Sequence, residues 1–285
     1  MVSKVKSFQL SDSDLMNVRE MARQIRINSV KMVYEAGSGH PGGSLSAADI
    51  LAVLYFRVLK IDPLDPENPD RDRFILSKGH ASPGMYSTLA LRGFFPVELL
   101  KDFRKLTSKL EGHVHRGVPG IESSTGSLGQ GLGIGVGMAL AAKLDKKKYH
   151  TFVMIGDGEL EEGSIWESLM AGFKFKLNNL IVILDRNGVQ LDGKTNDIMP
   201  LHDIPAMVSS FGWHVIEIDG HDYNQILSAL EQAKESNDLP TFIVAHTVKG
   251  KGVSYMEGNY KYHGSPPASK EEFDTAMKEL GADAL

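Results

Sequence analysis

Two oxygen-bearing side chains each lie just past an apolar run of the chain, and their spacing suits a divalent metal ion. Asp157, in GDGELEEG, follows the run 151–155, and Asn187, in LDRNGV, follows the run 180–184. One helix and one strand would fill the interval, so both side chains can emerge at neighbouring strand ends. Because Mg²⁺ prefers oxygen ligands and usually takes only one or two side chains, with phosphate and water completing its shell, we interpret the pair as a magnesium site.

Glycines beside Asp157 favour an anion at the same place. Gly156 and Gly158 would let a ligand come close to the backbone, and a helix expected from about Leu160 would offer its free amides. A phosphate group could therefore dock beside the metal ion.

Three patterns leave other interpretations open. A strand-end Asp often caps the next helix, and Asn187 followed by Gly188 could equally form a turn. GVQLDGKT at 188–195 also satisfies the phosphate-loop pattern GxxxxGK[ST], which keeps a P-loop nucleotide hydrolase as an alternative function. A phosphate loop needs a helix straight afterwards, however, and Pro200 and Pro205 break any helix of useful length, so we interpret this match as accidental.

The elements that must hold these side chains are predicted to form a doubly wound α/β fold. From Tyr149 onward, apolar runs alternate with helical stretches. The runs are 151–155, 180–184, 213–218 and 241–245. Because runs without polar alternation are buried on both faces, they predict a mostly parallel sheet with helices on each side, to which 74–76 adds a short strand. Ligands of such sheets lie beyond the carboxyl ends of the strands, where Asp157 and Asn187 would meet.

Two helices are expected ahead of this sheet. Residues 15–32 repeat apolar side chains at helical spacing after SDSD, whose Ser and Asp can cap free amides, so a long amphipathic helix should open the fold. A second, more buried helix is expected at 46–59, and the proline-containing DPLDPENPDRD should be an irregular surface connection. Alternate glycines over 129–137 should allow close helix packing. Since no repeat or linker interrupts the chain, 1–285 is predicted to form a single domain.

Composition excludes several classes of protein. The 285 residues include 31 basic and 36 acidic side chains, a net charge of -5, which gives no electrostatic footprint for nucleic acid or an anionic membrane. The absence of cysteine removes thiol nucleophiles, disulfides and thiolate metal sites. The longest aliphatic run, 180–184, is too short to span a bilayer, and the first residues have no apolar core of signal-peptide length. We therefore expect a cytoplasmic protein whose partners are small molecules or proteins.

Further motifs carry a family resemblance. They are GSGHPGGSLSAADIL at 37–51, RFILSKGHASPGMY at 73–86, EGHVHRGVPGIESSTGSLGQGLGIGVGMA at 111–139, and KGKGV and YHGSP towards the end. Together with GDG and the later Asn, they resemble the amino-terminal, diphosphate-binding part of transketolase, from about residue 28 to 266. The resemblance implies thiamine diphosphate and Mg²⁺ as cofactors, and transfer of a two-carbon ketol unit from a ketose phosphate to an aldose phosphate.

The resemblance also implies which residues hold the cofactors. Asp157, Asn187 and the carbonyl of Val189 would ligate Mg²⁺. Side chains and backbone from several motifs would contact thiamine diphosphate. These are His80, Gly126, Ser127, Leu128, Gly158, Glu162, Asn187 and Lys249, of which 126–128 would approach the aminopyrimidine and Gly158 the diphosphate. Lys78 and Lys249 would help to neutralise phosphate, and Glu162 matches a carboxylate at an interface that joins two cofactor sites.

Four histidines match those that line the active-site channel of the family: His40, His80, His113 and His263. Ketol transfer must move protons near neutral pH, and imidazole titrates nearest that range, so they are the catalytic candidates. His115 follows His113 by two residues, and in an extended segment only one of the two rings is expected to face the site. The resemblance favours His113, because its GH matches the family motif.

The resemblance implies a partner as well. In the family, a carboxylic acid that acts on the aminopyrimidine comes from a pyrimidine-binding domain, and this sequence reaches Leu285 before such a domain begins. We therefore expect an enzyme that is active only with a separate carboxy-terminal transketolase subunit, in a heterotetramer with two of each chain. A split 1-deoxyxylulose-5-phosphate synthase, a transketolase for a branched sugar phosphate and a non-catalytic regulatory chain remain alternatives.

Overall fold

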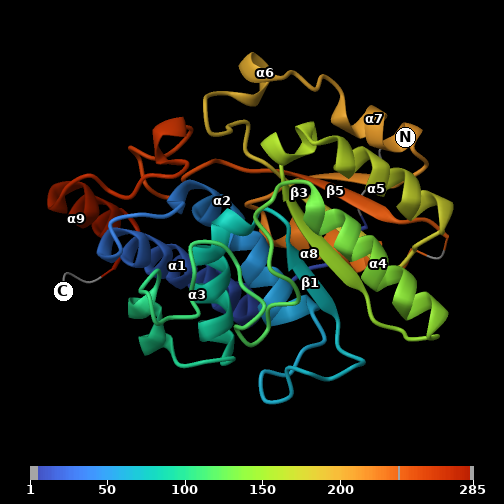
Figure 1. The fold of residues 1–285 in the computed structure, drawn as a ribbon, viewed down its shortest axis with the longest axis horizontal. Coiled ribbons are helices and arrows are strands. Elements are labelled where there is room, and N and C mark those ends of the chain that lie inside the picture. The colour runs from blue at the N-terminus through green and yellow to red at the C-terminus, as the bar shows by residue number, and fades with distance from the viewer. Residues whose placement is uncertain (1–5, 237, 283–285) are drawn as a thin grey trace.

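A sheet of five parallel strands forms the centre of the molecule within residues 6–236 and 238–282, the part of the chain that the computed structural model describes (Figure 1). The strands are β1 (Arg73–Leu76), β2 (Thr151–Gly156), β3 (Leu180–Arg186), β4 (His214–Asp219) and β5 (Thr241–His246). Their order across the sheet is β1-β2-β3-β5-β4, with every neighbouring pair parallel. The predicted doubly wound α/β fold is confirmed, including the short strand near 74–76.

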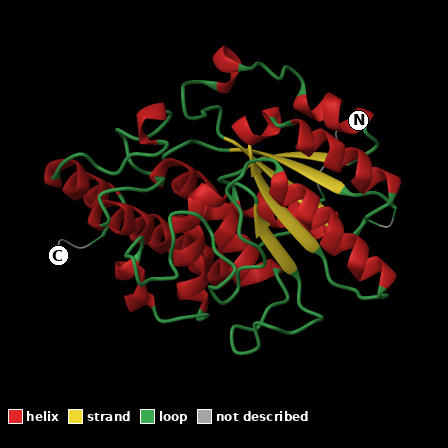
Figure 2. Cartoon of the chain, in the orientation of Figure 1, coloured by secondary structure: helices red, strands yellow, loops and turns green. Residues whose placement is uncertain are grey.

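Helices cover both faces of the sheet (Figure 2). On one face lie α4 (Gln130–Leu144), α5 (Gly163–Lys174) and α7 (Ile204–Ser210), and on the other lie α1 (Asp12–Glu35), α2 (Pro41–Val53), α3 (Ser82–Arg92) and α8 (Tyr223–Lys234). Strand β2 shows why both layers are needed. Phe152 and Met154 belong to the core beneath α2 and α8, whereas Val153 and Ile155 belong to the core beneath α4 and α5, and all four are fully buried.

The first helix follows its sequence pattern. Ser11 is the N-cap residue of α1, and its Oγ accepts a hydrogen bond from the backbone amide of Asp14 at 3.2 Å. Val18, Ala22 and Ile25 lie on one stripe of the helix and are fully buried. The predicted capped amphipathic helix is therefore confirmed.

The second helix begins earlier than the sequence pattern indicated. The predicted span was 46–59, but α2 starts at Pro41, and a π-helical turn, Leu54–Val58, follows its end. Proline suits the first turn of a helix, where its missing N–H is not needed. Gly42 is required by packing rather than by a turn, since a Cβ there would lie 2.8 Å from the carbonyl oxygen of Tyr262.

The helix expected from Leu160 also begins elsewhere. A 3-10 turn, Gly158–Glu161, comes first, and α5 starts at Gly163. The Glu159 side chain in this turn folds back to accept hydrogen bonds from the amide of Gly156, at 3.1 Å, and from that of the distant Gly129, at 2.8 Å.

The remaining elements are short. Two helices, α6 (Thr195–Ile198) and α9 (Lys270–Glu279), and three 3-10 turns, Gly79–Ala81, Val97–Asp102 and Tyr260–Tyr262, complete the described part of the chain. Helix α6 has only four residues, and Lys194 before it is exposed, so the segment lacks the helix that a phosphate loop requires. No helix in the described residues is long and apolar enough to cross a bilayer.

Candidate functional site

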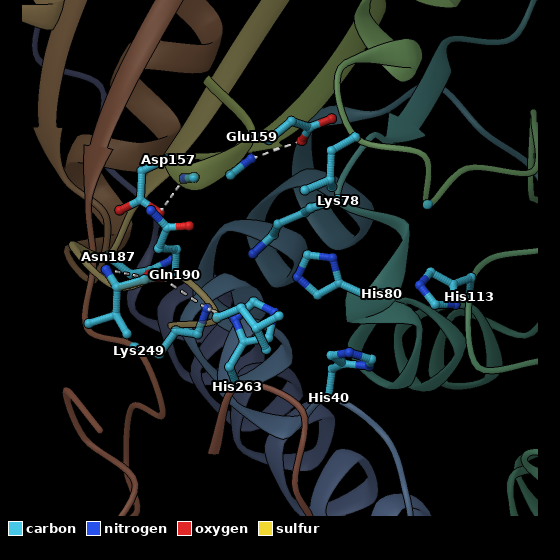
Figure 3. A pocket seen from close by; sticks show the side chains of 16 residues that line it. His40, Lys78, His80, His113, Asp157, Glu159, Asn187, Gln190, Lys249 and His263 are labelled. Carbon is cyan, nitrogen blue, oxygen red and sulfur yellow. Dashed lines mark hydrogen bonds between the residues drawn. The ribbon is translucent and has the colours of Figure 1, made fainter. Parts of the chain in front are cut away.

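A cavity of about 240 Å³ opens beyond the carboxyl ends of β1, β2, β3 and β5 (Figure 3). Residues from eight separate segments of the chain line it. They are His40, Lys78, His80, His113, Gly126, Leu128, Gly156, Asp157, Gly158, Glu159, Asn187, Val189, Gln190, Leu191, Lys249 and His263. The place is the one that parallel α/β topology assigns to ligands. Twelve of the fourteen residues that the sequence resemblance assigned to the site line this cavity, and the exceptions are Ser127 and Glu162.

The three predicted metal ligands lie together at one end of the cavity. Asp157 is buried, and its two carboxylate oxygens accept hydrogen bonds from the backbone amides of Gly158 and Gly188. Oδ1 of Asn187 accepts a hydrogen bond from the amide of Val189 at 3.2 Å. A carboxylate, an amide oxygen and a backbone carbonyl therefore line the same wall.

This donor set fits Mg²⁺ with phosphate. Burial, reinforced by the nearby Asp185, raises the pKa of Asp157 to about 6 even though Lys249 opposes the shift, so its carboxylate would gain from another positive charge. Among the described residues no group of three or more His, Cys, Asp or Glu side chains is placed to hold a metal ion. One carboxylate with two neutral oxygens suits a hard cation that completes its shell with phosphate oxygens and water.

Two buried lysines supply positive charge to the cavity. Lys78 Nζ donates to the carboxylate of Asp185 and, at 2.9 Å, to the carbonyl of Gly43. Lys249 Nζ donates to the carbonyl of Val189 at 3.2 Å, and burial lowers its pKa to about 8 although Asp157 opposes the change. Both ammonium groups are thus held where a phosphate could reach them.

The four predicted catalytic histidines form one cluster opposite the metal donors (Figure 3). The ring centroid of His40 lies 5.1 Å from that of His80, 5.8 Å from that of His113 and 5.6 Å from that of His263. The ring centroids of His80 and His263 lie 5.0 Å apart. Segments before α2, after β1, before α4 and after β5 thus bring their imidazoles to a single wall.

These histidines are held in the neutral form. Burial, followed by the nearby His113, lowers the pKa of His40 to about 4. Burial, followed by the Lys249 ammonium, lowers the pKa of His263 to about 3 and that of His80 well below 6.5. Burial also lowers the pKa of His113. At pH 7 each ring can therefore accept a proton at one nitrogen and donate one from the other.

Hydrogen bonds distinguish the nitrogens of two rings. Nδ1 of His263 lies 2.9 Å from Nζ of Lys249, so it accepts from the ammonium and the ring proton is on Nε2. Nδ1 of His40 is buried without a hydrogen-bond partner among the described residues. A buried polar atom with no partner is costly, which makes His40 a candidate to meet a bound polar molecule.

The segment 126–128 lies beside the histidines. Gly126 has φ +143°, and a Cβ there would lie 2.5 Å from Cδ2 of His113, so only glycine allows the segment this close to the ring. Gly126 and Leu128 line the cavity, while the Ser127 residue is exposed. His115 does not line it and instead has its Nδ1 3.3 Å from the amide of Gly117.

Glu162 lies outside the cavity lining. It is the N-cap residue of α5, and its side chain is exposed next to Gly129, where a Cβ would come within 2.8 Å of the Glu162 Cβ. Its surface position leaves it accessible to another chain.

Four residues of the site were missed by the sequence analysis. Glu159, Gln190 and Leu191 line the cavity, and Asp185 lies directly behind it. Asp185 is two residues before Asn187 and faces the same way in an extended strand, which is a signal that could have been read. Glu159 gave none, because its partners Ser77 and Gly129 lie far away in the sequence.

Comparisons with known proteins agree with this geometry. The family model described as "Transketolase, thiamine diphosphate binding domain" matches residues 17–284. The chain is 44% identical to one of the subunits of the apulose-4-phosphate transketolase of Phocaeicola vulgatus, covering 88% of this chain and 89% of that one. It is 43% identical to the 6-deoxy-6-sulfo-D-fructose transketolase subunit SqwG of Clostridium sp., covering 93% and 96%.

A solved structure adds the fold. Transketolase from Leishmania mexicana superposes with a TM-score of 0.88 at 35% sequence identity, covering 93% of this chain and 41% of that one. The chain thus spans about two fifths of that transketolase.

Proposed function

Because the chain belongs to the transketolase family, in which it is a thiamine diphosphate-binding subunit, we propose that it forms the diphosphate-binding half of a two-chain transketolase that requires Mg²⁺. The observation that carries the proposal is a single cavity with hard oxygen donors on one wall and four neutral histidines on the other. Metal and diphosphate would be held at the first wall and sugar at the second. We further propose that the chain forms one domain.

Asp157, Asn187 and the carbonyl of Val189 would hold Mg²⁺, and Lys249 would add charge for the diphosphate. Bound thiamine diphosphate would supply the electron sink that lets a ketose carbon–carbon bond break. The protein's own part would be to fix the position of the reactants and to exclude water, and ligands that directly follow the ends of β2 and β3, with Asp157 and Val189 buried, would serve both purposes. Gly126 and Leu128 would approach the aminopyrimidine, with Ser127 contributing backbone only.

The histidines would move protons on the sugar. Since His40, His80, His113 and His263 have lowered pKa values, each would be a neutral acceptor or donor for sugar hydroxyls and carbonyls near pH 7. Nδ1 of His40 has no hydrogen-bond partner in the part of the chain that the structure describes, which supports a direct contact with substrate.

A partner chain would complete the site. The relatives named as subunits have nearly the length of this chain, whereas the Leishmania transketolase is more than twice as long. A carboxy-terminal transketolase subunit would supply the pyrimidine-binding domain with its carboxylic acid, in a heterotetramer with two copies of each chain. The exposed Glu162 at the start of α5 supports an interface there. The donor would be a ketose phosphate and the acceptor an aldose phosphate.

Mixing purified chains tests this proposal. This chain with a carboxy-terminal subunit, thiamine diphosphate and Mg²⁺ should transfer a two-carbon unit from xylulose 5-phosphate to an aldose phosphate, and this chain alone should not. Ketol transfer by the single chain would refute the need for a partner. Turnover of pyruvate in place of xylulose 5-phosphate would instead identify a synthase of the deoxyxylulose phosphate type.

A further inference from the structure

Asp185 is a fully buried carboxylate that lies behind the residues lining the cavity. It is the last residue but one of β3, the central strand, and lies in register between Gly156 of β2 and Ala245 of β5. A buried carboxylate without partners would be strongly destabilising, so its hydrogen bonds account for its presence.

Four side chains from four segments donate to this carboxylate. Oδ2 accepts from Ser46 Oγ at 2.7 Å, from the ammonium of Lys78, and from Nδ2 of Asn187 at 3.2 Å. Oδ1 accepts from Thr247 Oγ1. Four donors, the Lys78 ammonium among them, are the partners that a buried carboxylate anion requires. Asp185 thus ties α2 and the ends of β1, β3 and β5 to one point.

The hydrogen bond between Asp185 and Asn187 fixes the orientation of the Asn187 side-chain amide. Nδ2 of Asn187 donates to Oδ2 of Asp185 and, at 3.3 Å, to the Asp185 backbone carbonyl. Oδ1 points away from Asp185 and accepts from the amide of Val189. A flipped amide would set its oxygen against two acceptor oxygens and turn its NH₂ away from Asp185. Only the observed orientation leaves the oxygen free to meet a cation.

We propose that Asp185 is a positioning residue: it holds the Asn187 amide with its oxygen directed toward the metal ion, and it pins the Lys78 ammonium at the cavity floor. The inference rests on the proposed function, because it takes Asn187 as a ligand of Mg²⁺. Asp185 does not line the cavity, so we assign it no direct contact with cofactor or substrate. Its effect passes through Asn187, whose place in the cavity Figure 3 shows beside Asp157.

The test measures the affinity of the purified chain for Mn²⁺ in the presence of thiamine diphosphate, by the loss of the free Mn²⁺ signal in electron paramagnetic resonance. Asp185→Asn keeps the shape of the side chain but allows the Asn187 amide to flip. The dissociation constant for Mn²⁺ should rise about tenfold or more, as expected when a hydrogen bond to a charged group is lost. At saturating Mn²⁺, binding of thiamine diphosphate should recover.

A matched control separates this effect from general damage. Thr247→Val removes another donor to the same carboxylate without touching Asn187, so Mn²⁺ affinity should stay within about twofold of the original. The exchanged pair Asp185→Asn with Asn187→Asp restores an amide donor facing a carboxylate. It should regain most of the affinity lost by Asp185→Asn.

The outcomes distinguish this inference from the proposed function. If Asn187→Ala binds Mn²⁺ as the unchanged chain does, the proposed ligand set fails. If Asn187→Ala binds weakly but Asp185→Asn binds normally, or if Thr247→Val loses as much affinity as Asp185→Asn, the positioning role of Asp185 is overturned and the ligand set stands.

A measurement on the unaltered chain covers the case in which Asp185→Asn does not fold. With asparagine labelled by ¹⁵N, the side-chain NH₂ of Asn187 should exchange slowly with water, both before and after Mg²⁺ and thiamine diphosphate are added. Exchange as fast as that of an exposed asparagine would overturn the role of Asp185.

Discussion

The four clustered histidines of the site make the stability of the folded chain depend on pH. They are His40, His80, His113 and His263. Each has a pKa below the ordinary value of 6.5 in the folded chain. Below about pH 6.5 the unfolded chain therefore binds more protons at these histidines than the folded chain does. The contribution of these neutral histidines to the free energy of unfolding is complete above about pH 6.5. It is lost as the pH falls from there toward the folded pKa of about 4 for His40.

Replacing His40 by Gln should therefore flatten the acid limb of the stability curve. Between pH 6.5 and 4 the free energy of unfolding of the variant should fall less than that of the unchanged chain, by roughly 1 kcal/mol after allowance for solvent screening of a partly exposed ring. Urea unfolding at a series of pH values measures this. His202→Gln removes an exposed histidine and serves as the control. Equal pH dependence in both variants would contradict the assignment.

Helix α4 shows how glycine lets an element approach the sheet. A Cβ on Gly135 would lie 2.4 Å from Cγ2 of Val153, and a Cβ on Gly131 would lie 2.4 Å from Oγ of Ser77. Gly137, on the same helix, is exposed and has nothing within 4 Å of a built Cβ. Gly131 and Gly135 therefore allow close packing and Gly137 does not, although these glycines alternate regularly in the sequence.

Two alanine substitutions in α4 should change the free energy of unfolding in opposite directions. Gly135→Ala forces α4 away from the stiff Val153 side chain in β2, and should lower the free energy of unfolding by roughly 1–3 kcal/mol. Gly137→Ala gains helix propensity at no steric cost and should raise it by about 1 kcal/mol. Denaturant unfolding of the two variants decides the matter, and a change of the same sign in both would show that α4 does not pack as described.

The sequence allowed the strands to be predicted but not all the helix starts. Strands buried on both faces are continuous apolar runs, so 151–155 and 180–184 could be recognised without knowing their neighbours. The starts of α2 and α5 depend on contacts with distant segments, such as Gly42 against Tyr262 and Glu159 against Gly129. Local pattern carries no record of these contacts.

The same division holds for the site. Residues in contiguous motifs, such as Asp157 and His80, could be assigned from the sequence, and the cavity contains them. Asp185 and Glu159 act through buried hydrogen bonds to Lys78 and Ser77, which the fold brings together from separate segments. Such networks exist only once the layers of the fold are assembled.

The molecule as a whole places the proposed metal ligands and the histidines on opposite walls of one cavity at the carboxyl edge of its sheet (Figure 3). In the proposed arrangement the cofactor would be bound by its diphosphate, and its reactive end would face the histidines and the proposed partner. The match covers 41% of the Leishmania transketolase. We propose that this chain binds the diphosphate of the cofactor and that a partner chain supplies the rest of the site.

Calorimetric titration of the purified chain with thiamine diphosphate tests that assignment most directly. With Mg²⁺ present, we predict saturable binding that disappears when EDTA removes the metal and when Asp157 is replaced by Ala, while Asp192→Ala, which removes a carboxylate from the same region outside the cavity lining, binds normally. Equal binding by the chain with Mg²⁺ and with EDTA, or no binding at all, would contradict it.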